Sequence, residues 1–564
     1  MILKALTQYY ARNAGEENGA LPPPGFEHKV IPVIIEIDRQ GELVQIHAND
    51  REATVPHRVK RATNVAANLL WDNADYVLGL AVKGKPARVA RQHAAFIERI
   101  RLLGDPAGSD DGIRALLSFL ENFDAASLEQ TPHWQRLQSN PNISFQLQHD
   151  NCLICERPNV MATLRDHWGK KAPGAVCLVT GNADKPERLH PLIKGVWGAQ
   201  SAGANIVSFN RNSSASYGKS QGLNAPVGKQ AVFAYTTALN HLLRKGSGQR
   251  FQVGDTTAVC WSAARHAFEA DFATIWGATP ASVKEDQDNY TGAVKAVFDA
   301  VRHGALADGG DTPFYVLGLA PNASRIAIRF WLTGTAGEFA VRTKAHFDYL
   351  EMVRADYQPA YPPLSLLLIN TAFREKPKHI LPSLGGDTLR TILADLPYPY
   401  TLFAATIRHC RAAQRVNYAR AAMIKAYLNK RFGTEVLKVA LDNDNTDPAY
   451  RSGRLFATLQ KLQEEAYPDI NATINERYYA AASGNPARIF PALLTRSNHH
   501  LTKLYNQGRR VNFEKLLGEM MADMPAALPA AMSLEEQGRF AVGYYHQRQN
   551  FFTKRGTSEP GDAL

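Results

Sequence analysis

The chain has 564 residues, of which 45% are hydrophobic, 21% charged and 9% aromatic. This length and composition exclude a small single-module protein and a disordered or fibrous chain, and they allow two or more domains with substantial cores. Lys and Arg number 64 and Asp and Glu 53, so the formal net charge is +11. A basic chain of this kind favours polyanionic partners such as nucleic acid.

The cysteine content and the hydropathy pattern predict a cytoplasmic protein. Five cysteines in a chain of this length are too few for a disulfide framework, which indicates a reducing compartment. The first 20 residues lack the apolar region of a signal peptide, and no stretch approaches about 18 apolar residues. We therefore expect neither secretion nor membrane insertion.

Two strands and two helices are predicted near the start of the chain. The β-branched run at 30–38 and the run at 42–48 are joined by the turn signal Arg39-Gln40-Gly41, which predicts a hairpin. Apolar residues recur at three- and four-residue spacing from Asn64 to Leu80 and from Arg88 to Leu103. This spacing predicts a helix in each segment.

The segment from Arg188 to Gly254 is the most informative part of the sequence. It has no Asp or Glu in 67 consecutive residues, and its eight Lys or Arg carry +8 of the net +11. Its middle is rich in Gly, Ser, Asn and Gln, which let a backbone approach a ligand closely. The pattern favours a loop that binds a phosphate backbone over a merely polar surface loop. The eight cations are Arg188, Lys194, Arg211, Lys219, Lys229, Arg244, Lys245 and Arg250.

The character of the chain changes near residue 400. Before it, strands are predicted at 256–263, 314–319 and 326–332, and proline-rich connections follow from 360 to 400. After it, the pattern is helical. We therefore predict an α+β fold, with a mixed α/β domain at 1–400 and an all-α bundle at 401–564.

The predicted bundle has six helical segments and a basic strip. Eight Lys or Arg lie between Arg408 and Lys438 against one acid, and further cations such as Arg454 and Arg509 are expected on the surface. Ser533 and Glu536 form a capping-box signature for the last helix. The segments are 401–431, 449–467, 470–482, 486–506, 511–523 and 533–553.

No motif predicts bound metal or phosphate-cradling chemistry. The sequence at 217–220 resembles the end of a P-loop, but Ser213 stands where that motif requires glycine. Cys152 and Cys155, with Cys177 and His190, could supply four zinc ligands, but their spacing is irregular. We expect no metal and no cofactor.

An alternative to a protein that only binds a polyanion is an enzyme, namely a DNA-processing, metal-dependent nuclease. Such chemistry needs carboxylates that converge on a cation, and the most basic segment has none. The candidates elsewhere are Asp255, Asp442, Asp444 and Asp447. The run at 442–447 resembles a cation loop in composition, but a turn between helices explains it better.

Several long segments resemble one family, the large subunit of the type I-C CRISPR Cascade, a crRNA-guided surveillance complex. The resemblance extends over nearly the whole chain. It rests on MILKAL (1–6), Tyr9-Tyr10, PPPGF (22–26), AANLLWDNADYVLGL (66–80), RLHPLIKGVWGAQSAGANIVSFN (188–210), YGKSQGLNAPV (217–227), LAPNASRIAIRFW (319–331), ALDNDNTDPAYRSGRLFATLQKLQ (440–463), NATINERYYAAAS (471–483) and EQGRFAVGYYHQRQNFF (536–552).

The resemblance implies a non-enzymatic DNA-binding subunit in antiviral defence. Such a subunit recognises the protospacer-adjacent motif (PAM) in duplex DNA, promotes R-loop formation, holds the displaced single strand and recruits the helicase-nuclease. The implied partners are crRNA and the backbone, crRNA-handle and small subunits. The C-terminal bundle resembles the small subunit, and an internal start, at Met423 or a non-AUG codon a little downstream, would release it.

The residue pattern and the resemblance converge on the segment from Ala202 to Asn224. Arg211 and Lys219 would hold phosphates, and short polar side chains would reach base edges. The candidates for base contact are Asn205, Ser208, Asn210, Asn212, Ser214, Tyr217, Gln221 and Asn224. Asn64 and Asn68 are secondary candidates, against the alternative that they are polar residues on a helix face.

Overall fold

The computed structural model describes residues 1–14, 21–59, 61, 65–81, 84–103, 110–124, 128, 132–169, 174–209, 211–303, 310–433, 436–522, 524–525 and 527–552. The chain forms two compact units. The first comprises Met1–Ile193 and Val207–His241, and the second Lys194–Ile206 and Leu242–Leu564. Helices account for 51% of the structure and strands for 14%, which confirms the predicted α+β class.

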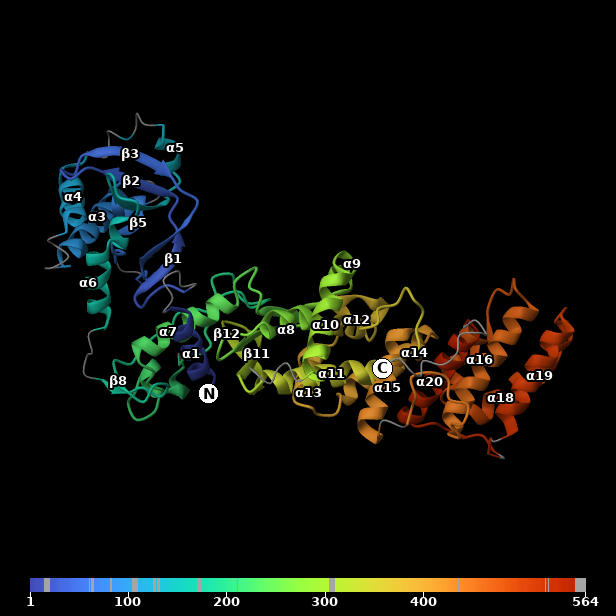
Figure 1. Ribbon diagram of the computed structural model, residues 1–564. Helices are drawn as coiled ribbons and strands as arrows, with labels where there is room; N and C mark the ends of the chain where they lie inside the picture. Colours follow the sequence, from blue (N-terminus) through green and yellow to red (C-terminus); the bar gives the residue numbers. More distant parts are fainter. Residues whose placement is uncertain are drawn as a thin grey trace. The chain divides into compact units, whose positions relative to one another are not determined.

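A four-stranded sheet forms the centre of the first unit (Figure 1). Its order is β3-β2-β6-β5: β2 (Val33–Ile37) pairs antiparallel with β3 (Leu43–Ala48) and parallel with β6 (Asn142–Leu147), which pairs antiparallel with β5 (Trp71–Asn73). The hairpin of β2 and β3 is the predicted one. Its turn is held by Asp38, whose Oδ1 accepts hydrogen bonds from two backbone N–H groups of the turn.

Helices pack their apolar faces against this sheet. α3 (Pro86–Arg101) confirms the helix predicted at 88–103, and it buries Phe96 beside α4 (Asp111–Asn122), which buries Phe119. The remaining elements of the first unit are α1 (Ile2–Ala14), β1 (Phe26–Val30), β4 (Glu52–Pro56), α2 (Ala74–Val77), α5 (Trp134–Leu137), η3 (Ile154–Glu156), α6 (Pro158–Gly169), β7 (Ala175–Val176), β8 (Ala183–Asp184), η4 (Asn212–Ser214), η5 (Gln221–Asn224) and most of α7 (Lys229–Leu242).

The helix predicted from Asn64 to Leu80 is wrong. The chain there forms the strand β5 and the four-residue helix α2. The carboxylate of Asp72 accepts the N–H groups of Asn68 and Asn73, each at 2.8 Å, and Leu70 has a left-handed φ of 63°. These local bonds and the pairing of β5 with β6 override the helical spacing of apolar residues.

A second four-stranded sheet, entirely antiparallel, begins the second unit. Its order is β12-β11-β10-β9, with β9 (Arg250–Val253) at one edge, then β10 (Thr256–Ser262), β11 (Pro313–Asn322) and β12 (Arg325–Thr335). The last three are the predicted strands. α8 (Phe268–Gly277) and α11 (Ala336–Leu350) contribute to the core beside this sheet, where the rings of Phe272, Phe314 and Phe339 meet.

The helices after residue 400 follow the predicted segments, except that the segment 401–431 contains two helices. Gln414, with a φ of 51°, ends the first, and the side chain of Asn417 caps the second. The predicted capping box of Ser533 and Glu536 is present. The helices before residue 400 in this unit were not predicted, and the segment 360–400, expected to consist of connections, contains four short ones. The remaining helices are α9 (Pro280–Glu285), α10 (Gln287–Arg302), α12 (Leu364–Ile369), η6 (Phe373–Glu375), η7 (Pro377–His379), α13 (Leu384–Leu393), α14 (Tyr400–Ala413), α15 (Tyr418–Phe432), α16 (Pro448–Ala466), α17 (Ile474–Ala482), α18 (Pro486–Lys503), α19 (Gln507–Ala522) and α20 (Leu534–Asn550).

Helices on both sides of residue 400 share one core. A single cluster of buried side chains extends from Phe251 to Tyr545, and the hydroxyl of Tyr545 donates to the carbonyl of Val353 at 2.9 Å. Met423 lies in this core, buried in α15. The chain thus continues its compact unit across the predicted boundary, and the release of the C-terminal bundle by an internal start stays a prediction.

The predicted basic strip from Arg408 to Lys438 is not a continuous exposed surface. Arg420 and Lys425 are buried, and they donate to the backbone carbonyls of Asn370 and Tyr349. Arg454 is also buried, contrary to expectation, because its guanidinium satisfies polar groups at 442–443 and 547. Charged side chains that serve the core in this way cannot also bind a phosphate backbone.

No helix in the described part of the chain is both long enough and apolar enough to cross a bilayer.

Candidate nucleic-acid interface

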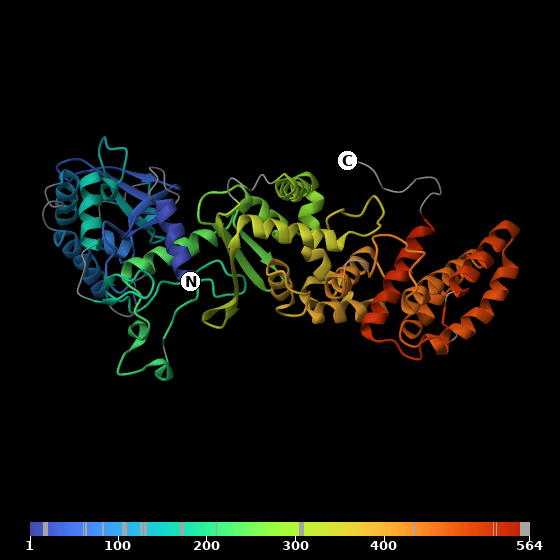
Figure 2. The same ribbon diagram turned by 60° about the horizontal axis from the view of Figure 1, so that its bottom comes forward.

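The segment 211–224 of the first unit is an exposed loop with two short helical turns, η4 and η5 (Figure 2). At its tip, the N–H of Lys219 donates to the carbonyl of Ser216 at 2.9 Å. The two central residues of this turn, Tyr217 and Gly218, both have positive φ, of 51° and 69°. Tyr217 is fully exposed. A bulky residue in the left-handed region is unusual and is found where the surrounding structure imposes it.

Asn224 imposes this conformation. Its Oδ1 accepts the N–H of Ser216 at 3.0 Å, and its Nδ2 donates to the carbonyls of Lys219 and Gln221 at 3.1 and 3.0 Å. Three hydrogen bonds from one amide therefore tie the turn to the end of the loop. A loop fixed in this way loses less conformational entropy when it binds a ligand.

Two further contacts hold the loop to the segment around Arg188, which precedes it in the chain. Arg188 donates to Oε1 of Gln221, and the N–H of Gly222 donates to the carbonyl of Arg188 at 3.2 Å. A Cβ atom at position 222 would lie 2.2 Å from the carbonyl oxygen of Glu187, so only glycine fits there. Gln221 and Gly222 thus anchor the loop.

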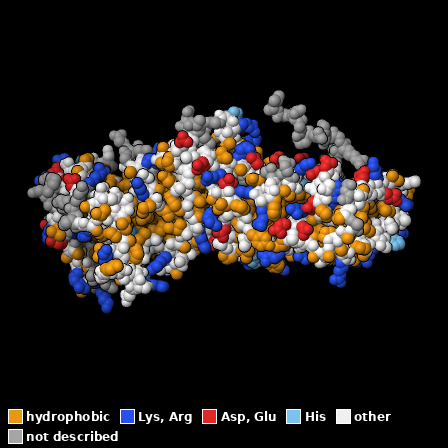
Figure 3. Space-filling model, turned by 90° about the horizontal axis from the view of Figure 1, so that it is seen from below, with side chains coloured by type: hydrophobic (Ala, Val, Ile, Leu, Met, Phe, Trp, Pro, Cys, Tyr) orange, Lys and Arg blue, Asp and Glu red, His pale blue; other side chains and the backbone are white. Residues whose placement is uncertain are grey.

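The cations of the loop are available to a ligand. Arg211 and Lys219 are exposed, and no described carboxylate forms an ion pair with either. Elsewhere in the unit, by contrast, Arg58 pairs with Glu27 and Arg61 with Asp72. On the face seen in Figure 3, Lys and Arg side chains at the lower left edge stand without an Asp or Glu beside them.

Two other cations of the acid-free segment already form contacts within the protein. Lys229 is half-buried, its Nζ lies 4.7 Å from the ring centroid of Trp168, and burial lowers its pKa. Arg250 donates to the carbonyl of Leu243 at 3.3 Å. The eight cations therefore do not form one continuous phosphate-binding surface.

The structure separates the predicted base-contacting residues. Ser208, Asn212, Ser214, Tyr217, Gln221 and Asn224 lie in the first unit, but Asn205 belongs to the second, where its backbone bridges to Ser324 and Ile326 beside β12. Asn210 lies outside the described residues. Within the loop, the exposed side chain of Asn212 makes no hydrogen bond to a described residue, whereas those of Gln221 and Asn224 are already engaged.

The structure describes only one of the two secondary candidates, because Asn64 lies outside the described residues. Asn68 is buried rather than on an exposed helix face, and its Oδ1 accepts the N–H of Val59 at 3.0 Å. Its amide therefore stabilises the first unit.

Sequence reasoning missed a small cleft of about 200 Å³ around Asn68. Lys29 lies there with its Nζ 4.8 Å from the ring centroid of Trp71. A sequence signal near this cleft is the excess of Lys and Arg over Asp and Glu from 51 to 101, ten against four, but spacing alone does not connect these residues to Lys29. The other lining residues are Arg58, Val59, Arg61, Asp72, Asn73 and Asn142.

The cysteines and carboxylates considered for metal binding do not come together. In the part of the chain that the structure describes, no three His, Cys, Asp or Glu side chains are placed to hold a metal ion. Cys155 is buried, and burial raises its pKa, while His190 bonds the hydroxyl of Tyr235. Asp447 caps α16, and Asp255 pairs with Arg329.

The exposed loop, held by hydrogen bonds and carrying two cations without a described ion pair, is the candidate nucleic-acid interface of this α+β chain. A family model described as CRISPR-associated protein (Cas_Csd1) matches residues 6–552. The chain therefore belongs to this family, the large subunit of type I-C Cascade, as the sequence resemblance predicted. No curated protein sequence matches it significantly.

Proposed function

We propose that this Cascade subunit recognises the PAM in duplex DNA through the loop 211–224, and that it does so without catalysing a reaction. In crRNA-guided complexes, guide pairing reads most of the target, and a protein surface reads the short PAM. The observation that carries the proposal is the exposed turn at Tyr217, held by Asn224 and flanked by the unpaired Arg211 and Lys219.

The loop residues have different proposed roles in DNA binding, according to the chemistry of their side chains. Arg211 and Lys219 attract phosphates and set the register on the duplex, which carries no sequence information by itself. Asn212 can donate and accept hydrogen bonds at a base edge. Tyr217 presents an aromatic ring beyond the protein surface, suited to wedge against or stack on a base.

The same proposal includes the steps that follow PAM recognition. The subunit promotes R-loop formation, holds the displaced strand, contacts crRNA and the backbone, crRNA-handle and small subunits, and recruits the helicase-nuclease. Tyr217 supports the first of these steps, because an inserted aromatic side chain unstacks a base step and starts strand separation.

The alternative of a metal-dependent nuclease finds less support. Oδ1 of Asp442 accepts from Lys438, and Asp447 caps a helix; both therefore have structural roles. Asp255 bonds Arg329 and the N–H of Ser383. Incubation of the purified chain with DNA and magnesium distinguishes the alternatives, since a nuclease would cleave the DNA.

A mobility-shift assay of the assembled complex on targets with a randomised PAM tests the proposal. The unaltered complex should select one PAM, and loop variants should lose affinity or selectivity. Full PAM selectivity after replacement of Arg211, Asn212, Tyr217 and Lys219 together by Ala would contradict it.

A further inference from the structure

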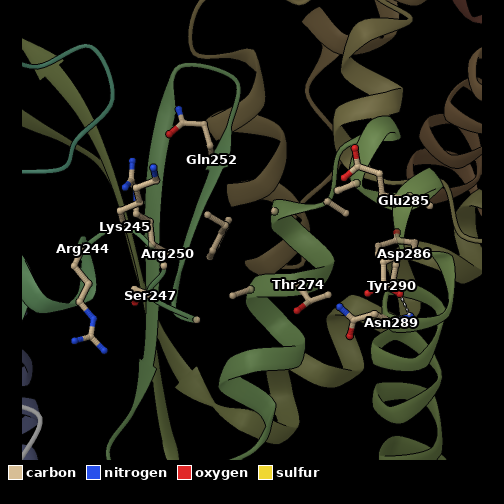
Figure 4. A pocket seen from close by; sticks show the side chains of 18 residues that line it. Arg244, Lys245, Ser247, Arg250, Gln252, Thr274, Glu285, Asp286, Asn289 and Tyr290 are labelled. Atoms are coloured by element: carbon tan, nitrogen blue, oxygen red, sulfur yellow. Dashed lines mark hydrogen bonds between the residues drawn. The ribbon is translucent and has the colours of Figure 1, made fainter.

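The second unit contains a pocket of about 600 Å³ at the free edge of strand β9 (Figure 4). One wall is the turn that follows α7, with Arg244 and Lys245, and the strand residue Arg250. The opposite wall is α9 and the start of α10, with Glu285 and Asp286. The pocket therefore gathers three of the eight cations of the acid-free segment, and it belongs to the second unit, whereas the loop 211–224 belongs to the first.

The opposed charges do not neutralise each other. Among the described residues, none of Arg244, Lys245, Glu285 and Asp286 takes part in an ion pair. In Figure 4 the cations lie on the β9 side of the pocket, and Glu285 and Asp286 lie on the side of α9 and α10. Oδ1 of Asp286 accepts the N–H of Asn289 at 3.1 Å. Arg244 and Lys245 are thus available to bind an anion, while the acidic wall offers acceptors to hydroxyl or amino groups.

The floor of the pocket is apolar. Phe251 and Tyr290 line it and are each 4% exposed, and Ala273 and Gly277 of α8 leave the space above them unfilled. A Cβ atom at Gly277 would lie 2.9 Å from Cβ of Phe251, so the helix and strand approach each other closely below the pocket. A flat ring would bury apolar surface on this floor.

We infer that this pocket binds one nucleotide of a single-stranded nucleic acid. The phosphate would lie against Arg244 and Lys245, the base would lie over Phe251 and Tyr290, and hydroxyl or amino groups would face Asp286 and Asn289. A nucleotide combines an anion at one end with a planar ring and hydrogen-bond donors at the other, in the order that the pocket presents. The inference does not depend on the PAM-binding loop.

Photocrosslinking of the full-length chain tests this inference. The probes are 5′-phosphorylated single strands of about 12 nucleotides, one of RNA with 4-thiouridine and one of DNA with 4-thiothymidine, and the crosslinked peptides are identified by mass spectrometry. We expect crosslinks to peptides that contain Phe251 or Tyr290. The two probes show whether the nucleotide comes from RNA or DNA.

Two variants report on the pocket separately. The double variant Arg244→Ala with Lys245→Ala should raise the Kd for the crosslinked probe about tenfold. Thr274→Trp should block the pocket without changing its charge, because Thr274 lines it from α8. The matched control is Arg477→Ala with Arg488→Ala, which removes two exposed cations of the same unit.

The outcomes separate this pocket from general electrostatic attraction. A larger rise in Kd for the pocket double variant than for the control, with loss of the crosslink in folded Thr274→Trp, supports the inference. Equal losses in the two double variants, or a crosslink that Thr274→Trp leaves unchanged, overturn it. PAM selectivity of the assembled complex, measured in parallel, should stay intact in the pocket variants. A failure of the pocket inference can therefore be distinguished from a failure of the proposal for the loop 211–224.

Discussion

The side-chain amide of Asn224 holds the backbone of Ser216, whose N–H donates to Oδ1 at 3.0 Å. Because the same amide also bonds the carbonyls of Lys219 and Gln221, it fixes the turn that exposes Tyr217. Asn224 therefore acts through the shape of the loop, whereas Asn212 has an exposed side chain with no bond to a described residue.

This difference predicts two distinct phenotypes. Asn212→Ala should reduce discrimination between matched and mismatched PAM by about 1 to 3 kcal/mol, since alanine cannot form a hydrogen bond with a base edge. Asn224→Ala should weaken binding to both targets alike. Titration of the assembled complex on the two targets measures both effects, and a selective loss in Asn224→Ala with none in Asn212→Ala would reverse the assignment.

The loop cations should determine part of the salt dependence of binding. Arg211→Ala with Lys219→Ala should lower the slope of log K against log salt by about 0.9 for each phosphate that the variant no longer binds. Arg39→Ala with Arg51→Ala removes two exposed cations of the same unit and serves as the control. Equal slopes for the two double variants would show that the loop binds no phosphate.

Two helices in the second unit pack through glycine. A Cβ atom at Gly453 of α16 would lie 2.0 Å from the carbonyl oxygen of Phe540, and one at Gly543 of α20 would lie 2.1 Å from that of Tyr450. Gly453→Ala should therefore destabilise the protein by about 2 kcal/mol or more. Gly518→Ala, in open space on α19, should stabilise it by up to about 1 kcal/mol. Thermal unfolding of both variants measures the contrast, and similar Tm values would contradict the close packing.

Two buried histidines should make the second unit sensitive to acid. Burial lowers the pKa of His346 and of His546 from 6.5 to about 3 in the folded protein. Below pH 6.5 the unfolded chain therefore binds more protons than the folded one, and stability falls as the pH decreases toward 3, by up to about 1.4 kcal/mol per pH unit for each histidine.

A neutral replacement tests this origin of acid sensitivity. His346→Asn can keep a hydrogen bond to the hydroxyl of Tyr398, which Nδ1 of the histidine makes at 2.8 Å. Its Tm should fall less steeply between pH 6.5 and 4.5 than that of the unaltered protein. An identical pH profile would mean that other groups dominate acid unfolding.

Local sequence signals predicted much of the fold. The hairpin of β2 and β3, strands β10 to β12, the C-terminal helices and the capping box at Ser533 all follow from periodicity, turn residues and caps, which act within a few residues. The helix prediction for 64–80 was wrong because Asp72 accepts hydrogen bonds from its neighbours and β5 pairs with β6. A pattern of apolar spacing contains information on neither interaction.

The sequence by itself determined the family, the net positive charge and the absence of acids from 188–254. Only the tertiary structure decided which of the cations and amides considered as binding residues are available to a ligand. Arg420, Lys425 and Arg454 are buried and therefore cannot reach a ligand. The amides of Asn68 and Asn224 already form hydrogen bonds within the protein. Asn205 belongs to a different unit from the loop. Composition counts charges and polar groups, but availability depends on the partners that folding brings to each one, because a buried polar group must be satisfied within the protein.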